Sequence, residues 1–96
     1  MRARIVGTGM SVPEKRLTNA DLEALVDTSD EWIKTRTGIS ERRMSEKHEK
    51  LSDFAVPAVQ RALEMSGISG RQVQMVICAT VTSDMPFPST ACIVQD

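Results

Sequence analysis

The chain has 96 residues, the size of one small domain, of which 41% are hydrophobic and 26% are charged. These fractions are close to those of globular proteins and exclude a disordered, fibrous or disulfide-scaffold chain. The net charge of −1 gives no overall positive field that would attract nucleic acid or an anionic membrane. We therefore expect a globular protein with no nucleic-acid partner and no membrane partner.

Cysteine usage and apolar runs indicate the compartment. Residues 75–81 form the longest apolar run, which is far shorter than the ~20 residues needed to cross a bilayer. Cys78 and Cys92 match neither a disulfide framework nor the CxxC spacing of metal sites, so we expect both to be reduced. We find no metal-ligand cluster and no carboxylate pair spaced for acid–base chemistry. The expected location is the cytoplasm.

Residues 3–13 begin with a β-branched run and then reach two glycines and a proline, which predicts a first strand that ends in a loop. Gly7 and Gly9 do not complete a dinucleotide-binding fingerprint. Val12 stands where the third glycine is required, and Pro13 interrupts the helix that should follow. We interpret the two glycines as a strand-exit turn.

A short helix is expected from residue 18, because Thr18 is followed by Asp21 and by apolar residues at helical spacing. Alternating charges over residues 39–44 predict an edge strand or an extended connection. His48 then lies in a charged turn without a nearby partner, so we interpret it as a solvated side chain and not as a ligand or base.

A second helix is predicted over residues 28–38. Thr28 and Glu31 form the pattern of a capping box, and Gly38 supplies a left-handed stop. Steps of four residues rotate by only about 40°, so Thr28, Trp32 and Arg36 are expected in one column. Such a column suits a nucleotide, stacked on the indole and bound by the guanidinium. The alternative is a core or interface anchor, with the arginine lying over the ring.

The longest predicted helix covers residues 52–66, with Gly67 as its C-terminal cap. Pro57 is costly inside a helix, so we expect the regular helix to begin near Val56. Residues 73–79 are apolar on both faces, as is typical of a central parallel strand covered on each side. Strand, helix and buried strand together predict an α/β sheet.

A proline-pinned loop containing Pro86 and Pro88 precedes a helix that begins near residue 90. Cys92 falls in the first turn of that helix, where a thiol can become a nucleophile. No base is visible near it, and its apolar neighbours suit a small packing residue. We interpret Cys92 as structural.

Four stretches, "IVGTG", "TNADLE", "DTSDEWIKTRTGISERR" and "PFPSTAC", resemble the N-terminal part of beta-ketoacyl-[acyl-carrier-protein] synthase III, a thiolase-like condensing enzyme. The resemblance covers essentially the whole chain. It implies an α/β fold in which residues 1–96 are an incomplete N-terminal segment of the first half of an αβαβα architecture. The implied order is strand, two short helices, strand, helix, central strand and the start of a helix.

The resemblance also implies an acyltransferase. The complete enzyme would condense an acyl-CoA primer, with acetyl-CoA expected, with malonyl-acyl carrier protein and so initiate fatty acid synthesis. Carbon dioxide and free CoA would leave. A homodimer is implied, with a CoA thioester as substrate and no permanently bound cofactor.

The same resemblance assigns roles to five residues. Trp32 and Arg36 match positions that bind CoA, with the indole on the adenine ring. Thr28 and Thr37 match positions that line the CoA entrance. Phe87 matches a loop position that helps to close the partner subunit's acyl pocket and influences primer length.

The family's catalytic cysteine, histidine and asparagine match no position up to Asp96, so we expect no catalytic residue here and no activity from the 96 residues alone. A truncated product or proteolytic fragment, self-associating through an open sheet edge, is the expectation. Three alternatives stay open. The chain could be a stand-alone module that binds CoA or an adenine nucleotide, an interaction or dimerisation piece, or part of a relative that uses branched or aromatic primers.

Overall fold

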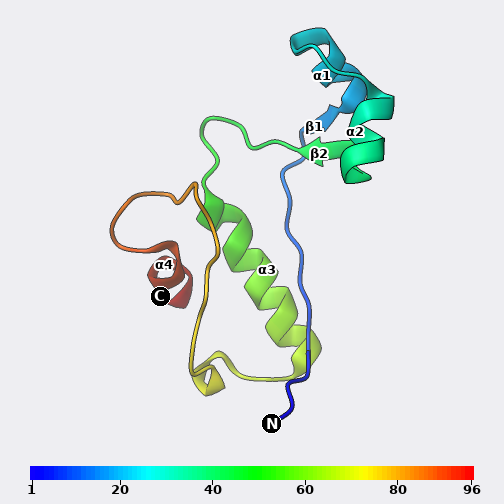
Figure 1. Ribbon diagram of the computed structural model, residues 1–96. Coiled ribbons are helices and arrows are strands. Elements are labelled where there is room, and N and C mark those ends of the chain that lie inside the picture. Colours follow the sequence, from blue (N-terminus) through cyan, green and yellow to red (C-terminus); the bar gives the residue numbers. More distant parts are fainter. The chain divides into compact units, whose positions relative to one another are not determined.

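The structure is a computed structural model that describes residues 1–96. The chain divides into two compact units, a terminal unit of residues 1–11 with 49–96, and a middle unit of residues 12–48. Figure 1 shows the helices and strands of each unit. None of the helices has both the length and the apolar character needed to span a membrane.

The middle unit contains a two-stranded antiparallel sheet and two short helices. In chain order these are β1 (Arg16–Thr18), α1 (Asn19–Leu25), α2 (Asp30–Thr37) and β2 (Glu41–Arg43). Arg16 pairs with Arg43 and Thr18 pairs with Glu41. The charged edge strand predicted over residues 39–44 is confirmed as β2. Its partner β1 was not predicted from the sequence.

The start of α1 follows the sequence prediction. The Thr18 hydroxyl accepts a hydrogen bond from the Asp21 backbone N–H at 3.2 Å, and the Asp21 carboxylate accepts from the Thr18 N–H at 2.9 Å. This reciprocal pair satisfies two donors that a helix N-terminus leaves without partners. The bond from the Thr18 N–H, and then a bond from the Thr18 hydroxyl to the same carboxylate at 2.9 Å, hold the pKa of the Asp21 carboxyl below its ordinary value.

The predicted cap of α2 is wrong by one residue. Ser29, not Thr28, is the N-cap, and its hydroxyl accepts from the Trp32 backbone N–H at 3.1 Å. Ser29 has the same hydroxyl chemistry as Thr28 and stands one residue closer to the helix, so it takes the capping position. The predicted stop is confirmed, because Gly38 has φ of 72° and its N–H donates to the Lys34 carbonyl at 2.8 Å.

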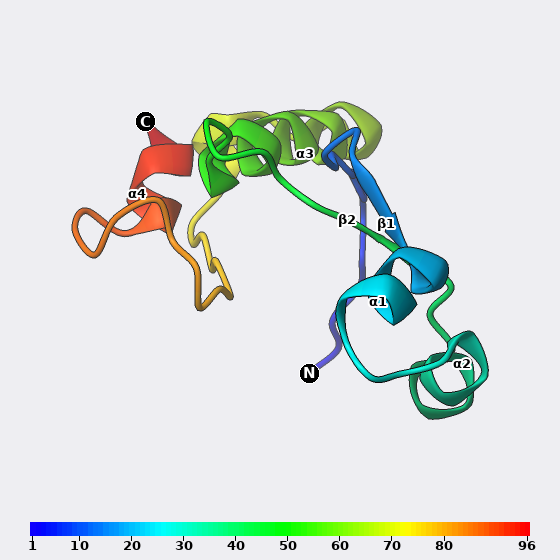
Figure 2. The ribbon, with the colours of Figure 1, turned by 90° about the horizontal axis from the view of Figure 1, so that it is seen from above.

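The terminal unit is built on one long helix. Its elements are α3 (Leu51–Ser66), a 3₁₀ turn η1 (Gly70–Gln72) and α4 (Thr90–Gln95). Helices α3 and α4 pack together and lie side by side in both Figures 1 and 2. Gly67, with φ of 72°, ends α3 as predicted. The helix predicted near residue 90 is confirmed as α4.

The expectation that the long helix begins near Val56 is wrong, because α3 already starts at Leu51. Its first turn is held from two sides. The Asp53 carboxylate accepts from the Lys50 N–H at 2.8 Å, and the Asp84 carboxylate accepts from the Ser52 N–H at 3.1 Å. These bonds satisfy N–H groups at the start of the helix, which continues through Pro57.

Two predicted strands are not formed as strands. Residues 3–13 and 73–79 are assigned no strand, and the sheet consists of β1 and β2 alone. A β-strand is defined by hydrogen bonds to a neighbouring strand, and no backbone hydrogen bond joins either segment to one. The first strand of this structure is therefore β1. Residues 3–11 and 73–79 run as extended chain within the terminal unit (Figure 1).

Gly7 and Gly9 serve a different purpose from the predicted turn. Neither has a positive φ. A Cβ placed on Gly7 would overlap the Ala62 carbonyl oxygen, and one on Gly9 would overlap the Ala58 carbonyl oxygen. The glycines therefore let the N-terminal segment approach the backbone of α3 more closely than any side chain allows.

Candidate functional site

Helix α2 presents Trp32 and Arg36 one turn apart. The Trp32 side chain is 57% exposed, and the Arg36 guanidinium carbon lies 5.6 Å from the centre of the indole ring. The four-residue spacing puts the two side chains on neighbouring positions of the helix surface, where the cation faces the negative face of the ring. The helix thus carries an exposed flat aromatic surface beside a positive charge.

Thr28 is not part of this helical column, because α2 begins at Asp30. The prediction of a column of three residues is wrong in that respect. Thr28 and Trp32 nevertheless meet at one place, since both line a hollow of about 300 Å³ together with Asp27 and Ser29. The indole therefore forms one wall of a concave surface whose other walls carry hydroxyl and carboxylate groups.

Thr37 lies at the opposite end of α2 from that hollow. Its hydroxyl donates to the Ile33 carbonyl at 2.7 Å and accepts from the Ile39 backbone N–H at 3.1 Å. These two bonds secure the end of the helix next to Gly38. The structure does not bring Thr37 into the hollow with Thr28 and Trp32.

The two cations of α2, Lys34 and Arg36, have different partners. Lys34 pairs with Asp30 at 2.9 Å, one turn earlier. Hydrogen bonds from Lys34 and then from Asn19 keep the pKa of the Asp30 carboxyl below its ordinary value. Lys34 is thus engaged by a carboxylate, whereas the Arg36 guanidinium lies over the indole.

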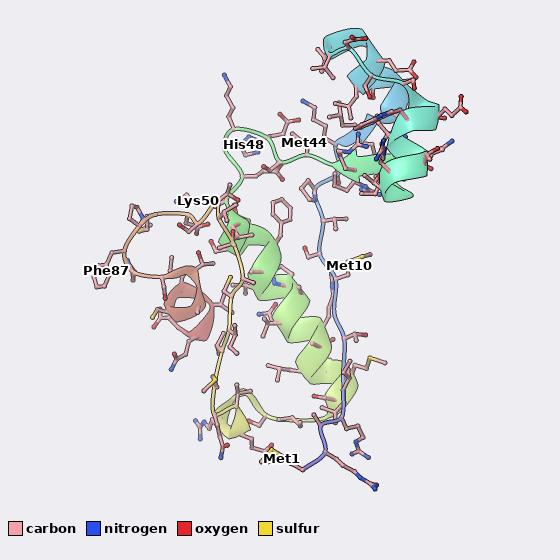
Figure 3. All side chains as sticks on the ribbon, in the orientation of Figure 1. Met1, Met10, Met44, His48, Lys50 and Phe87 are labelled. Atoms are coloured by element: carbon pink, nitrogen blue, oxygen red, sulfur yellow. The ribbon has the colours of Figure 1, made fainter.

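Phe87 lies in the loop before α4 and is 87% exposed. Figure 3 shows it on the outer side of that loop. The loop is fixed to α3 by Asp84, whose carboxylate accepts from the Ser52 hydroxyl at 2.5 Å and from the Ser52 N–H at 3.1 Å. Hydrogen bonding from Ser52 lowers the pKa of the Asp84 carboxyl. An anchored loop therefore presents an uncovered aromatic ring.

Cys92, in the first turn of α4, is exposed, so the expected packing role is wrong. The Ser89 hydroxyl donates to the Cys92 sulfur at 3.2 Å, and no histidine lies in the terminal unit. His48, in the segment after β2, is exposed (Figure 3). Both cysteines are free, and no group of three or more His, Cys, Asp or Glu side chains could hold a metal ion.

Sequence reasoning missed the polar group beneath α2. Asn19, at the start of α1, is 1% exposed and accepts a hydrogen bond from Arg42 of β2 at 2.7 Å. One signal was present in the sequence. Alternation along β2 places Arg42 on the face opposite Glu41 and Arg43, and an arginine that becomes partly buried there requires a partner.

Comparisons with known proteins agree closely with one another, although no family model matches the chain. Among curated proteins, beta-ketoacyl-[acyl-carrier-protein] synthase III from Symbiobacterium thermophilum is 57% identical over 91 residues, which is 95% of this chain and 28% of that protein. The synthase III from Geobacillus kaustophilus is 52% identical over 96 residues, which is 100% of this chain and 31% of that protein.

Solved structures give the same result. The crystal structure of 3-oxoacyl-[acyl-carrier-protein] synthase III from Aquifex aeolicus VF5 matches with a TM-score of 0.82 at 49% identity, covering 96% of this chain and 30% of that one. The priming beta-ketosynthase of the R1128 polyketide biosynthetic pathway matches with a TM-score of 0.81 at 30% identity, covering 99% of this chain and 30% of that one. The predicted α/β, thiolase-like fold class is confirmed.

The chain spans less than a third of the length of these curated relatives, 28% to 31%. Within that span the identity is high and the match runs through the residues that form both units. Over the segment compared, the chain belongs to the beta-ketoacyl-[acyl-carrier-protein] synthase III family of condensing enzymes.

Proposed function

We propose that this chain is part of a condensing enzyme that joins an acyl-CoA primer, with acetyl-CoA the expected one, to malonyl-acyl carrier protein. The acyl group leaves the CoA sulfur, the malonyl group loses its carboxylate as carbon dioxide, and a new carbon–carbon bond joins the two acyl units. The product would start a fatty acid chain. Within residues 1–96 we assign binding residues and no catalytic residue.

The exposed indole of Trp32 is the observation that supports this proposal most strongly. A large aromatic side chain on the surface, beside a hollow that Thr28 also lines, suits a flat ligand better than it suits a packing role. Stacking of a base on an aromatic ring is worth about 1–3 kcal/mol. The adenine of CoA is the ring that we assign to Trp32.

Arg36 supplies the second element of recognition. Its guanidinium lies 5.6 Å from the Trp32 ring centre, within reach of a ligand stacked there. A guanidinium binds phosphate oxygens through paired, charge-assisted hydrogen bonds, and CoA carries phosphates close to its adenine. We assign Arg36 to those phosphates. Thr28 and Thr37 stay predicted entrance residues, with Thr28 the better placed.

We further propose a cytoplasmic homodimer in which Phe87 contacts the partner subunit's acyl pocket. The 87% exposed ring, on a loop anchored through Asp84, supports an intermolecular role. Two free cysteines are in keeping with a reducing compartment. We expect Phe87→Ala to let the dimeric gene product accept longer primers, measured as the ratio of kcat/KM for hexanoyl-CoA and acetyl-CoA. An unchanged ratio would argue against this role.

Calorimetric titration with CoA tests the binding assignment in the complete gene product. We expect Trp32→Ala to weaken CoA binding about tenfold, because loss of one stacked base removes roughly 1–3 kcal/mol. Arg36→Ala should weaken binding to a similar extent. Neither variant should alter the binding of 4′-phosphopantetheine, which lacks the adenine nucleotide.

Lys34→Ala is the matched control, because it removes a cation from the same helix that is already paired with Asp30. It should leave the affinity for CoA within about twofold of the wild type, as is usual for an exposed ion pair. Equal affinities for CoA in the wild type, Trp32→Ala and Arg36→Ala would refute the proposed site. Transfer of labelled acetyl groups to malonyl-acyl carrier protein tests the reaction itself.

A further inference from the structure

The middle unit is organised around a polar side chain. Asn19 is 1% exposed and is the largest fully buried side chain in the protein, whereas the buried hydrophobic residue Ile33 is 8% exposed. A buried amide is costly unless its donors and acceptor are all satisfied. Asn19 therefore marks a place where the fold requires a specific set of hydrogen bonds.

The partners of Asn19 come from three different places. Its side-chain nitrogen donates to the Asp30 carboxylate at 2.7 Å and to the Ile39 carbonyl at 2.8 Å. Its side-chain oxygen accepts from the Arg42 guanidinium at 2.7 Å. The chemistry of the partners fixes the amide orientation, because a carboxylate and a carbonyl can only accept and a guanidinium can only donate.

These bonds hold both ends of α2. Asp30 is the first residue of that helix, and Ile39 follows its glycine cap, so one amide group joins the start of the helix to the chain that leaves it. The Glu23 carboxylate adds a further link from α1 by accepting from the Asp30 N–H at 2.6 Å. The helix is thus fixed in position and in rotation about its axis.

Fixing Asp30 determines where the CoA-facing side chains point. An α-helix turns by about 100° per residue, so Trp32 lies about 200° and Arg36 about 240° around the helix from Asp30. Both therefore project from the face opposite the bond to Asn19. A change in the rotation of α2 would move the indole and the guanidinium together.

We propose that Asn19 is a positioning residue for nucleotide recognition, which holds α2 in the rotation that presents Trp32 and Arg36 to the adenine nucleotide of CoA. The ligand named here rests on the proposed function. The positioning of the indole does not, and it can be measured without any ligand. Asn19 itself touches Asp30, Ile39 and Arg42 and has no direct contact with Trp32 among its hydrogen bonds.

Asn19→Asp tests the proposal with little change in side-chain size. It keeps an acceptor for Arg42 but replaces the donor with a second carboxylate next to Asp30, so the helix should be pushed out of position. Trp32 is the chain's single tryptophan, and its near-ultraviolet circular dichroism reports how rigidly the indole is held. We expect that signal to fall at least about twofold while far-ultraviolet dichroism is retained, and CoA to bind about tenfold more weakly.

Reversing the polarity of the pair should rescue the variant. In Asn19→Asp/Asp30→Asn the new carboxylate can accept from the new amide, so the hydrogen bond between positions 19 and 30 is restored without two facing charges. The bond to the Ile39 carbonyl stays lost, so the rescue is partial. We expect the double variant to regain at least about half of the lost near-ultraviolet signal. It should also regain at least about half of the lost free energy of CoA binding. Asp30→Asn alone keeps an acceptor for Asn19 and serves as the matched control with little effect.

The outcomes separate this inference from the proposed function. If Asn19→Asp lowers thermal stability but leaves the near-ultraviolet signal and the CoA affinity unchanged, Asn19 has only a structural role and the inference is wrong. If the dichroism changes and is rescued while even the wild type fails to bind CoA, the positioning stands and the ligand assignment fails. Should Asn19→Asp be insoluble, the double variant and Asn19→Ser are compared with Asp30→Asn by the same two measurements.

Discussion

Each of the two units of this protein is stabilised internally in a different way. In the terminal unit, the N-terminal segment packs against α3 through Gly7 and Gly9, where backbone meets backbone. In the middle unit, α1, α2 and β2 are joined by hydrogen bonds that converge on the buried Asn19. Shape decides the first arrangement, and matched donors and acceptors decide the second.

The surfaces of the two units differ accordingly. Extended segments of the terminal unit leave large apolar side chains uncovered, with Ile5 84%, Ile77 82% and Val81 102% exposed. Apolar surface of that kind is suited to burial in an interface. The middle unit satisfies its buried polar groups internally and exposes Trp32 beside a hollow. Uncovered apolar segments in one unit and an exposed indole beside a hollow in the other are thus combined in one short chain.

The largest predicted effect concerns the steric contact in the terminal unit. Gly9→Ala should destabilise this unit by about 3 kcal/mol, because the new methyl group would overlap the Ala58 carbonyl of α3 and backbone atoms cannot move aside cheaply. Urea unfolding of the gene product gives the free energy. Hydrogen exchange at the amides of α3 locates the effect.

Gly70→Ala is the control for this change. The nearest atom to a Cβ at Gly70 is the Leu63 Cδ1 at 3.9 Å, an ordinary contact distance. We expect a change of less than about 1 kcal/mol, of either sign. Equal costs at the two glycines would show that the close approach to α3 does not determine the cost at Gly9.

Local signals in the sequence predicted local structure well. The Thr18 cap and the Gly38 and Gly67 stops are each decided within a few residues, and all three are confirmed. Contacts between distant residues were not predictable in this way. The burial of Asn19 depends on Arg42, and the start of α3 depends on Asp84, partners 23 and 32 residues away along the chain.

In the predicted site, too, relations within one helix were predicted correctly and the others were not. Trp32 and Arg36 lie close together because their spacing within one helix is fixed by helix geometry. Thr28 was assigned to the helix because Thr28 and Ser29 offer equivalent caps, and one-sequence reasoning has no means to rank them. The strands expected in residues 3–13 and 73–79 needed pairing partners, which local pattern does not supply.

A smaller effect is expected at the cap of α2, where the polar character of the middle unit can be tested further. Ser29→Ala removes the hydroxyl that accepts from the Trp32 N–H, and loss of such a cap costs about 1 kcal/mol. Urea unfolding measures the cost. Because the helix start also carries Trp32, the emission maximum of the indole should shift in the same variant.

Thr28→Ala provides the comparison within the same two-residue stretch. It removes a hydroxyl that lies outside α2, so the free energy of unfolding should change by less than about 0.5 kcal/mol. CoA affinity is the property expected to respond to Thr28→Ala, because Thr28 lines the hollow. A larger loss of stability for Thr28→Ala than for Ser29→Ala would restore the sequence-based assignment of the cap.

The smallest expected effect concerns the hydrogen bonds between Asp84 and Ser52, a polar contact in the unit where close packing otherwise decides the arrangement. Hydrogen bonds from Ser52 lower the pKa of Asp84 from its ordinary 3.8, so the carboxylate contributes stability that is fully present above the ordinary value. That contribution is lost as the pH falls through 3.8 to the lowered pKa of the folded state. Asp84→Asn should therefore be less stable than the wild type near neutral pH, and the difference should shrink on acidification.

Ser52→Ala tests whether Asp84→Asn loses stability through its hydrogen bonds or through the changed shape of the side chain. It removes the hydroxyl donor and should reproduce most of the loss at neutral pH, and combining it with Asp84→Asn should add little, because the two changes break one interaction. Stability curves measured by urea unfolding from about pH 7 down to about pH 2.5 provide the comparison. A difference between wild type and Asp84→Asn that stays constant over this range would mean that the amide fails for steric reasons. Shape would then determine the contact between the Phe87 loop and α3, as it determines the contact between the N-terminal segment and α3.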